Sequence, residues 1–287
     1  MEIGIGLPAT IPGVTGAALV EWARRSEARG FSTLATLDRL VYANYEPLVA
    51  LTAAAAVTER IRLTTAILIA PLRLNTALLA KQTATTDNLS GGRLVLGLAP
   101  GGREDDFQAG GADFHRRGRM LDQQLDELRR IWNGERRGFA GAIGPAPTQA
   151  GGPPLILGGS APATFRRAAR YGEGWIAGGG GPDLFRQGAE ALAAAWAEAG
   201  RAGQPRKLAL TYFALGPDAR RHAESYLRDY YAFLDQWVDA IIAGAAVTED
   251  MVRQQVAAFA EAGCDELILF PCSTDPAQVD LLADAVQ

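Results

Sequence analysis

Two glycine-rich segments of this 287-residue chain have residue types that bind anions. The first, LGGSAPAT at 157–164, leads from an apolar run into an amphipathic one. Free backbone amides at a helix start attract negative charge, and the hydroxyls of Ser160 and Thr164 add two polar groups. The second is the run Gly178–Gly181, which follows the next apolar run. This pattern predicts a phosphate site. The alternative is that Ser160 only caps the helix and the glycines only form turns.

A third segment, at 90–107, predicts a ligand-facing loop. The run LVLGLA at 94–99 is continuously apolar, which is typical of a parallel strand covered on both faces. Gly101 and Gly102 follow it directly, so the backbone can turn sharply there and a flat ligand can approach closely. The acidic residues at 104–106 are expected to form a solvated turn and the start of a helix.

Short apolar runs alternate with longer amphipathic runs along the whole chain, which positions these loops. The expected strands are 3–7, 33–37, 62–69, 94–99, 154–157, 174–177, 208–215 and 266–270. Helical spacing follows each of them, so the sequence predicts an α/β fold, a single (β/α)8 TIM-barrel domain over 1–287. An insertion at 134–153 follows the fourth helix, and a long helical crossover, 218–242 and 248–262, follows the seventh strand. A doubly wound open sheet is the alternative, but the first strand lacks the GxGxxG of a dinucleotide-binding unit.

Composition excludes several classes of partner. The net charge is −4 with no basic run, so no nucleic-acid partner is expected. No apolar run has membrane-spanning length and the first residues do not resemble a signal peptide, so a cytoplasmic protein without a membrane contact is expected. The two cysteines are expected to be reduced thiols.

The expected barrel mouth is poor in groups that do chemistry by themselves. Lys81 and Lys207 are the chain's two lysines, and neither lies at a strand end where a Schiff base could form. The two histidines do not have the spacing of metal ligands, and His115 is expected at the surface, so we predict no metal site. Glycine, proline and small apolar residues dominate the strand ends. Such a mouth suits a protein whose cofactor carries the reactivity.

Several segments, taken in order, resemble the bacterial luciferase-like superfamily of flavin-dependent oxidoreductases. They are EARGF at 27–31, TERIRL at 58–63, IAPLR at 69–73, LAKQTATTDNLSGGR at 79–93, GGREDDF at 101–107, GGS at 158–160 and GEGW at 172–175. Each piece is weak alone, but their order and spacing extend over nearly the whole chain.

The resemblance implies a barrel that binds reduced FMN, or alternatively the deazaflavin coenzyme F420, in its mouth. The ring would lie over the early strands near a bulge or non-proline cis peptide at 66–68, with the phosphate at the later glycine loops. The cofactor-binding residues implied are Asp38, Ala66, Ile67, Leu68, Gly101, Gly158, Gly159, Ser160, Thr164, Gly178 and Gly179. The chemistry implied is oxygen activation by the reduced ring or hydride transfer from it.

One position departs from the family pattern. Relatives commonly place a histidine after the aspartate that ends the second strand, whereas this chain has Arg39. A guanidinium cannot act as a general base. Arg39 is therefore predicted to hold an anionic substrate or to stabilise negative charge on the ring. The alternative is a rim salt bridge with Asp38 or Glu46.

Aromatic residues are expected around a substrate pocket. The residues predicted to line it are Leu7, Tyr42, Tyr45 and Cys272. The aromatic segment 226–237 is expected to cover the pocket or a partner subunit, and relatives suggest a homodimer. The leading hypothesis is a luciferase-like monooxygenase that uses reduced FMN and oxygen on a small organic molecule. The alternatives are an F420-dependent reductase or dehydrogenase and a non-catalytic flavin-binding protein.

Overall fold

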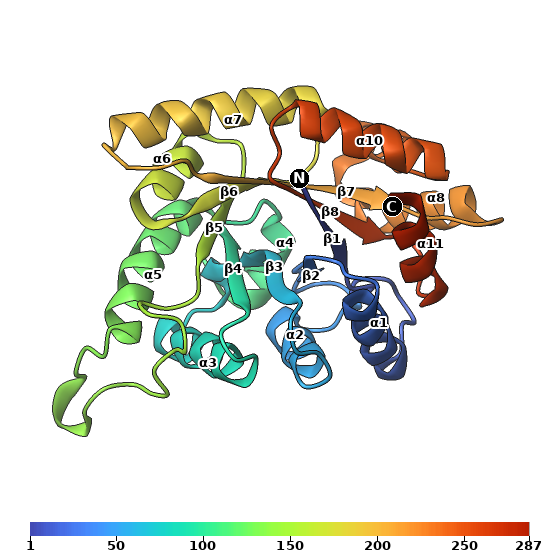
Figure 1. The fold of residues 1–287 in the computed structure, drawn as a ribbon. Helices are drawn as coiled ribbons and strands as arrows, with labels where there is room; N and C mark the ends of the chain where they lie inside the picture. The colour runs from blue at the N-terminus through green and yellow to red at the C-terminus, as the bar shows by residue number, and fades with distance from the viewer. Residues whose placement is uncertain (287) are drawn as a thin grey trace.

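The computed structural model describes residues 1–286. Its strands form one closed parallel barrel in chain order, β1 to β8 (Figure 1). This closure confirms the TIM barrel and rules out the doubly wound sheet. The strands are β1 Glu2–Gly6, β2 Thr33–Thr36, β3 Arg62–Ile69, β4 Leu94–Ala99, β5 Leu155–Gly158, β6 Gly174–Ala177, β7 Arg206–Phe213 and β8 Glu266–Pro271.

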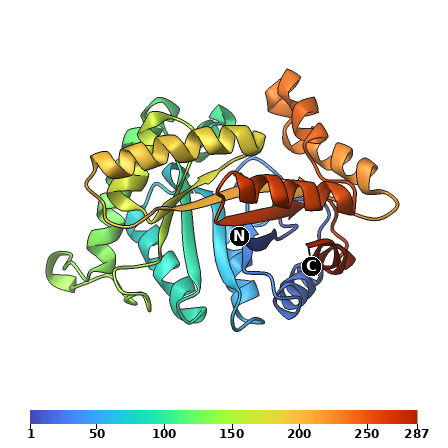
Figure 2. The same cartoon turned by 45° about the horizontal axis from the view of Figure 1, so that its top comes forward.

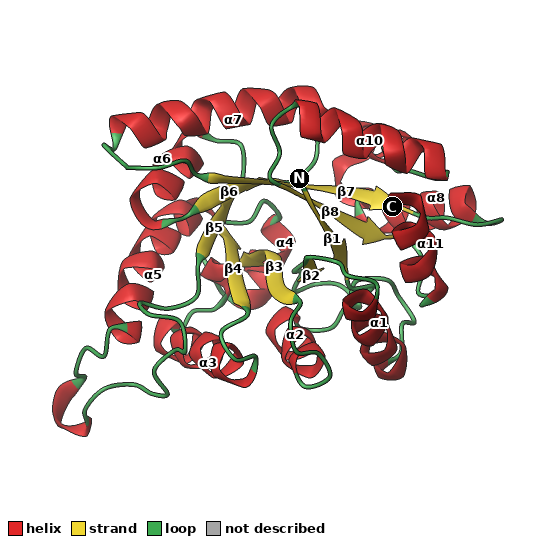
Figure 3. Cartoon of the chain, in the orientation of Figure 1, coloured by secondary structure: helices red, strands yellow, loops and turns green. Residues whose placement is uncertain are grey.

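Helices surround the barrel on its outside (Figure 3). They are α1 Gly16–Ala28, α2 Pro47–Ala55, α3 Thr76–Leu89, α4 Glu104–Gly110, α5 Arg117–Trp132, α6 Pro162–Tyr171, α7 Gly181–Glu198, α8 Ala219–Tyr230, α9 Val238–Ala243, α10 Glu249–Glu261 and α11 Ala277–Val286. Short 3-10 turns are η1 Ala70–Leu72, η2 Phe114–Arg116, η3 Gly138–Ala140 and η4 Ala232–Trp237. Within residues 1–286, no helix combines the length and apolar character needed to cross a bilayer.

Two apolar layers follow from the alternation of side chains along the strands. The outer layer packs the strands against the helices and includes Leu34, Leu63 and Trp22. The inner layer fills the barrel and includes Ala35 and Phe270. Phe270 lies so close to Gly6 that a Cβ there would stand 2.2 Å from its ring. The barrel is therefore a packed core, and ligands can reach only its rim.

The crossover after β7 differs from the prediction. A single helix over 218–242 is wrong, because the chain forms α8, η4 and α9 in succession. Asp235 within η4 has φ 40°, a left-handed conformation that interrupts helical hydrogen bonding. The two helices project from one side of the barrel in Figure 2. The break follows Tyr231 and Phe233 in the chain, and Trp237, which comes after it, is largely exposed.

The segment 134–153 is a surface excursion, as predicted. Its regular structure is the turn η3 and an isolated antiparallel bridge between Arg136 and Ala142. Phe139 in η3 is fully exposed. The excursion projects away from the barrel beyond α5 (Figure 1). It lies far from the strand ends that carry the candidate site.

Candidate functional site

The carboxyl end of β3 contains a break in strand pairing. Thr65 pairs with Leu96 and Leu68 with Leu98, so one extra residue is accommodated in β3, and the Ala66–Ile67 peptide is cis. Gly97 on β4 permits this, because a Cβ there would lie 1.9 Å from the Thr65 carbonyl oxygen. The bulge lies where the family resemblance placed it.

The bulge directs neighbouring side chains to opposite layers. Ala66 and Ile67 pack with the barrel interior, and Ile67 reaches β5, where its Cδ1 lies 2.8 Å from an ideal Cβ on Gly158. Leu68 is fully buried in the outer layer instead. Ala66, fully buried, and Ile67, partly buried, thus lie on the interior side of β3, whereas Leu68 faces the helices.

The loop after β5 leads into an uncapped helix. The residue at the N-cap of α6 is Ala161, which has no capping side chain, and Pro162 follows. The alternative in which Ser160 caps this helix is therefore wrong. Ser160 and Gly159 are exposed, whereas Thr164 is buried in the first turn. The amides of this turn consequently have no side-chain acceptor at the helix start.

Side chains of α6 and β6 fix the backbone of the loop that follows β5. Gly159 has φ 123°, a conformation that favours glycine, and an ideal Cβ on it would stand 2.9 Å from the Thr164 Oγ1. The indole of Trp175 on β6 donates to the Gly159 carbonyl oxygen at 2.7 Å and stacks on Phe185. Trp175 is thus a buried residue that also positions the glycine loop.

The loop after β6 provides a second uncapped start. Gly178 and Gly179 are exposed, and Gly180 occupies the N-cap of α7 without a capping side chain. Because β5 and β6 are neighbouring parallel strands, both helix starts lie at the same end of the barrel. The two predicted phosphate-binding segments are thereby brought together.

Asp38, at the end of β2, organises the end of β3. Its Oδ2 accepts from the Ile69 amide at 2.7 Å, and Arg73 pairs with both carboxylate oxygens, with its Nη2 at 3.1 Å from Oδ1. Arg73 also pairs with Glu46, whose other oxygen caps α2. Burial raises the pKa of Asp38, and the Arg73 charge opposes this. Asp38 thus holds the strand end that follows the bulge.

Arg39 has a different ionic partner from the one predicted. The rim salt bridge with Asp38 or Glu46 is wrong, because Arg73 occupies both carboxylates. The Arg39 Nε lies 3.3 Å from Oδ2 of Asp106 on α4, and both side chains are buried. The expectation of a solvated Asp106 is therefore wrong: α4 begins with exposed Glu104, and its third residue turns inward.

An aromatic roof, defined as Tyr226, Tyr230, Tyr231 and Phe233, lies over the barrel interior. Tyr226 and Tyr230 pack with the inner layer. The hydroxyls of Tyr212 and Tyr231 are 2.6 Å apart, as are those of Thr10 and Tyr226. Burial raises the pKa of Tyr231 to about 12 and those of Tyr212, Tyr226 and Tyr230 well above the ordinary value. These phenols therefore stay neutral at physiological pH.

The predicted pocket residues separate into two groups. Cys272 is buried in the inner layer, and Tyr42 lies beside the roof, its ring 5.1 Å from that of Tyr230. Burial raises the pKa of Cys272, so it remains a thiol. Leu7 packs in the outer layer, and exposed Tyr45 donates to the Val14 carbonyl oxygen. The latter two therefore do not face the barrel interior.

Two further residues named from the sequence, Gly101 and His115, lie in the loop after β4 and in η2. Gly101 has φ 81°, and a Cβ there would meet Ile69 at 2.6 Å, so the β4 loop packs closely against β3. His115 is exposed in η2, as expected. Within the described residues 1–286, no cluster of three metal-ligating side chains occurs.

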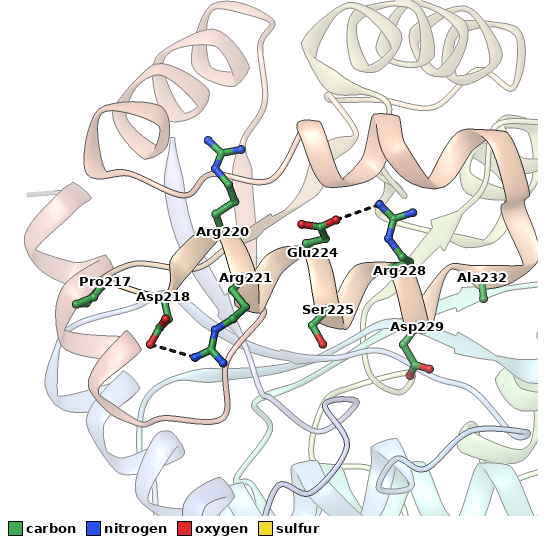
Figure 4. A pocket seen from close by; sticks show the side chains of 9 residues that line it. All are labelled: Pro217, Asp218, Arg220, Arg221, Glu224, Ser225, Arg228, Asp229 and Ala232. Atoms are coloured by element: carbon green, nitrogen blue, oxygen red, sulfur yellow. Dashed lines mark hydrogen bonds and ion pairs between the residues drawn. The ribbon is translucent and has the colours of Figure 1, made fainter.

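A hollow of about 830 Å³ lies on the outside of α8 (Figure 4). Its charged side chains largely pair with one another: Asp218 with Arg221 at 3.1 Å and Glu224 with Arg228 at 3.3 Å. The faces of α8 that form it are exposed, whereas its buried face carries the roof. This hollow is therefore separate from the glycine loops.

The sequence indicated the aromatic segment but not the positions of Arg73 and Tyr212 at the mouth, nor the burial of Asp106. Arg73 stands inside a quoted family segment, and Asp106 is one of three consecutive acids. Neither has a local pattern that indicates burial.

The family model for luciferase-like monooxygenases matches residues 1–266. The chain belongs to this family. Among curated relatives, the luciferase-like chain is 35% identical over 173 residues to the uncharacterized protein Rv0953c of Mycobacterium tuberculosis, a match that covers 58% of this chain and 61% of that protein. The match thus spans about three fifths of that relative.

Solved structures share this luciferase-like fold at low identity. An F420-dependent secondary alcohol dehydrogenase, solved with an F420-acetone adduct, has a TM-score of 0.81 and 18% identity over 100% of this chain and 99% of its own. The oxygenating constituent of 3,6-diketocamphane monooxygenase from Pseudomonas putida, solved with FMN, has a TM-score of 0.78 and 17% identity over 100% and 96%. These likenesses establish the fold.

Proposed function

We propose that the chain is a flavin- or deazaflavin-dependent oxidoreductase, with a monooxygenase that uses reduced FMN and oxygen on a small organic substrate as the leading case. One observation carries the proposal: the β3 bulge brings Ile67 against Gly158, beside two uncapped helix starts. An apolar platform thus lies next to an anion-binding edge. A flat redox ring with a phosphate tail requires both an apolar surface for the ring and backbone donors for the phosphate.

The residues present fit such a cofactor. The amides at the starts of α6 and α7, with Ser160 and Thr164, would hold the phosphate. Ala66 and Ile67 would support the ring. When bound, the ring would supply the electrons for oxygen activation or hydride transfer. The protein would bind and orient the reactants, and the roof would exclude water from them.

Proton transfer at position 39 is not part of the proposal. An arginine cannot serve as a general base, and Arg39 is engaged with Asp106 and with the carbonyl oxygens of Val41 and Tyr230. It is therefore not free to bind an anionic substrate group in this conformation. We propose a reaction in which the substrate needs no acid or base from the end of β2.

Anaerobic titration tests the proposal and separates the two cofactors. Purified protein is titrated with FMN, F420 and riboflavin in their oxidised, fluorescent state, and ring fluorescence is followed. The reduced rings are then titrated under anaerobic conditions and followed by absorbance. Saturable binding of FMN or F420, tighter than that of riboflavin, is expected. Failure of both phosphate-bearing ligands to bind at millimolar concentration would refute the proposal.

A deazaflavin-dependent dehydrogenase is the second candidate. The F420-dependent glucose-6-phosphate dehydrogenase of Mycobacterium avium, 28% identical over 204 residues, favours it. Tighter binding of F420 than of FMN, together with no oxygen consumption, would select this candidate. A non-catalytic flavin-binding protein would bind a ring but give no turnover with oxygen or with a panel of carbonyl and alcohol substrates.

We further propose a homodimer in a reducing, cytoplasmic compartment. Val49 on α2 and Leu78 on α3 are exposed near the starts of adjacent helices, with Leu74 just before α3. Together they supply apolar surface that a second copy would cover. Both cysteines are free thiols, which supports the compartment.

A further inference from the structure

Arg39 joins three separate segments at the barrel mouth. Its Nη2 donates to the Val41 carbonyl oxygen at 3.0 Å within the β2–α2 loop. Its Nε faces the Asp106 carboxylate of α4 at 3.3 Å. Its Nη1 donates to the carbonyl oxygen of Tyr230, the last residue of α8, at 3.3 Å. These segments are far apart in sequence, so one side chain links the loop, the helix and the roof.

Aromatic rings enclose the same guanidinium. The Arg39 Cζ lies 5.1 Å from the ring centre of Tyr42, 5.4 Å from that of Tyr230 and 5.9 Å from that of Phe233. Arg103 adds a contact from the side of α4, since its Cζ is 4.1 Å from the Phe233 ring centre. Cations over ring faces are attracted more strongly when water is excluded, and Arg39 is 8% exposed.

Hydrogen bonds from the β2–α2 loop hold the Asp106 carboxylate next to the Arg39 guanidinium. Its Oδ1 accepts from the Leu40 and Val41 amides at 3.1 and 2.7 Å, which fixes the carboxylate beside the loop. Its Oδ2 is buried and has no aligned hydrogen bond, as is also true of the Arg39 Nε. Arg103 Nε lies 4.0 Å from the same Oδ2, so Arg39 is the nearer of two cations beside this buried carboxylate. Loss of the nearer cation leaves a buried charge poorly compensated, which disfavours the present arrangement of the loop and the roof.

We propose that Arg39, through its pair with Asp106, is a positioning residue that holds the aromatic roof over the barrel mouth. The charge at position 39 thus acts on the roof rather than on the reacting atoms. Its effect on cofactor exchange rests on the proposed function; its effect on the roof does not. Loss of the charge should free Tyr230 and Phe233 and increase access to the mouth.

Hydrogen exchange of the full chain tests this assignment. Arg39→Met removes the charge while it keeps a long side chain, and Asp106→Asn keeps an oxygen for the two loop amides. Arg167→Met is the matched control, because Arg167 pairs with Asp122 at 2.6 Å between α5 and α6, away from the roof. Peptides covering 226–237 should exchange roughly tenfold faster in both mouth variants, and β5 and β6 should not change.

The dissociation rate of a bound cofactor gives a second measurement, which reports access to the barrel mouth. In stopped-flow measurements, FMN should dissociate roughly tenfold faster from Arg39→Met and Asp106→Asn than from Arg167→Met. The reason is that an open roof no longer retains the ring. Exchange at 226–237 that is unchanged, or that rises equally throughout the barrel, would overturn the assignment. If Arg39→Met does not fold, Asp106→Asn decides by the same criteria. If no ring binds, the proposed function fails, and the exchange experiment still decides whether Arg39 holds the roof.

Discussion

Replacing Thr164 with valine tests the phosphate site with a small change. Thr164 is the third residue of α6 and is 3% exposed. Its Oγ1 lies 2.9 Å from the position that a Cβ on Gly159 of the loop after β5 would occupy. Valine has nearly the same shape but lacks the hydroxyl, so the loop and the helix should keep their positions. What should be lost is one hydrogen bond to the bound anion.

The expected magnitude follows from the charge on the acceptor. A hydrogen bond to a charged group contributes about 1.5–3 kcal/mol, and about 1.4 kcal/mol corresponds to a tenfold change in affinity. Thr164→Val should therefore weaken FMN or F420 binding by roughly 10- to 100-fold. Riboflavin has the ring of FMN but no phosphate, so its affinity should not change.

The assay is fluorescence titration of wild type and variant with FMN, F420 and riboflavin under anaerobic conditions. Thr83→Val is the matched control, because Thr83 is also buried but donates to the Leu79 carbonyl oxygen of its own helix α3. Equal affinity of wild type and Thr164→Val for the phosphate-bearing rings would refute the placement of the phosphate. So would a loss of the same size for riboflavin.

Three further predictions concern stability and assembly. Glu266 is buried and pairs with Arg62 and Arg206 at 3.0 and 2.8 Å. Burial raises the pKa of Glu266, but the Ser32 hydroxyl and these arginines outweigh it, so the folded pKa is lower than the unfolded one. The ionised carboxylate therefore stabilises the fold above the unfolded pKa. This stabilisation is lost as the pH falls through the lower folded pKa. Glu266→Gln should cost about 2 kcal/mol at neutral pH, less than a fully buried pair, because the arginines stay partly solvated. This deficit should shrink in thermal melts as the pH is lowered below the ordinary glutamate pKa of 4.5; a constant deficit would contradict the mechanism. Gly97→Ala should disrupt the β3 bulge and greatly reduce soluble yield, whereas Gly16→Ala, with open space around it, should express normally. Leu78→Glu should convert a dimer into a monomer in gel filtration, and an unchanged elution volume would exclude α3 from the interface.

The sequence predicted the barrel well because its signals are local. The run at 62–69, rich in β-branched and apolar residues, and the apolar run at 94–99 match β3 and β4 to the residue, and the spacing at 117–132 matches α5. The crossover was harder to predict. Asp235 has no glycine or proline beside it to mark a break, so helical spacing extended through 218–242 although the chain turns there. The break at Asp235 is visible only in the tertiary structure.

By itself, the sequence determined the order of strands and helices, the glycines that permit close approach, and the family. These depend on periodicity and on backbone conformations that particular residue types allow. The tertiary structure alone decided which charges meet. Arg39 lies one residue from Asp38 yet pairs with Asp106, because Arg73 occupies Asp38 and Glu46. Such pairing depends on where neighbouring strands end and which carboxylates are buried, and no local pattern along the chain encodes that geometry.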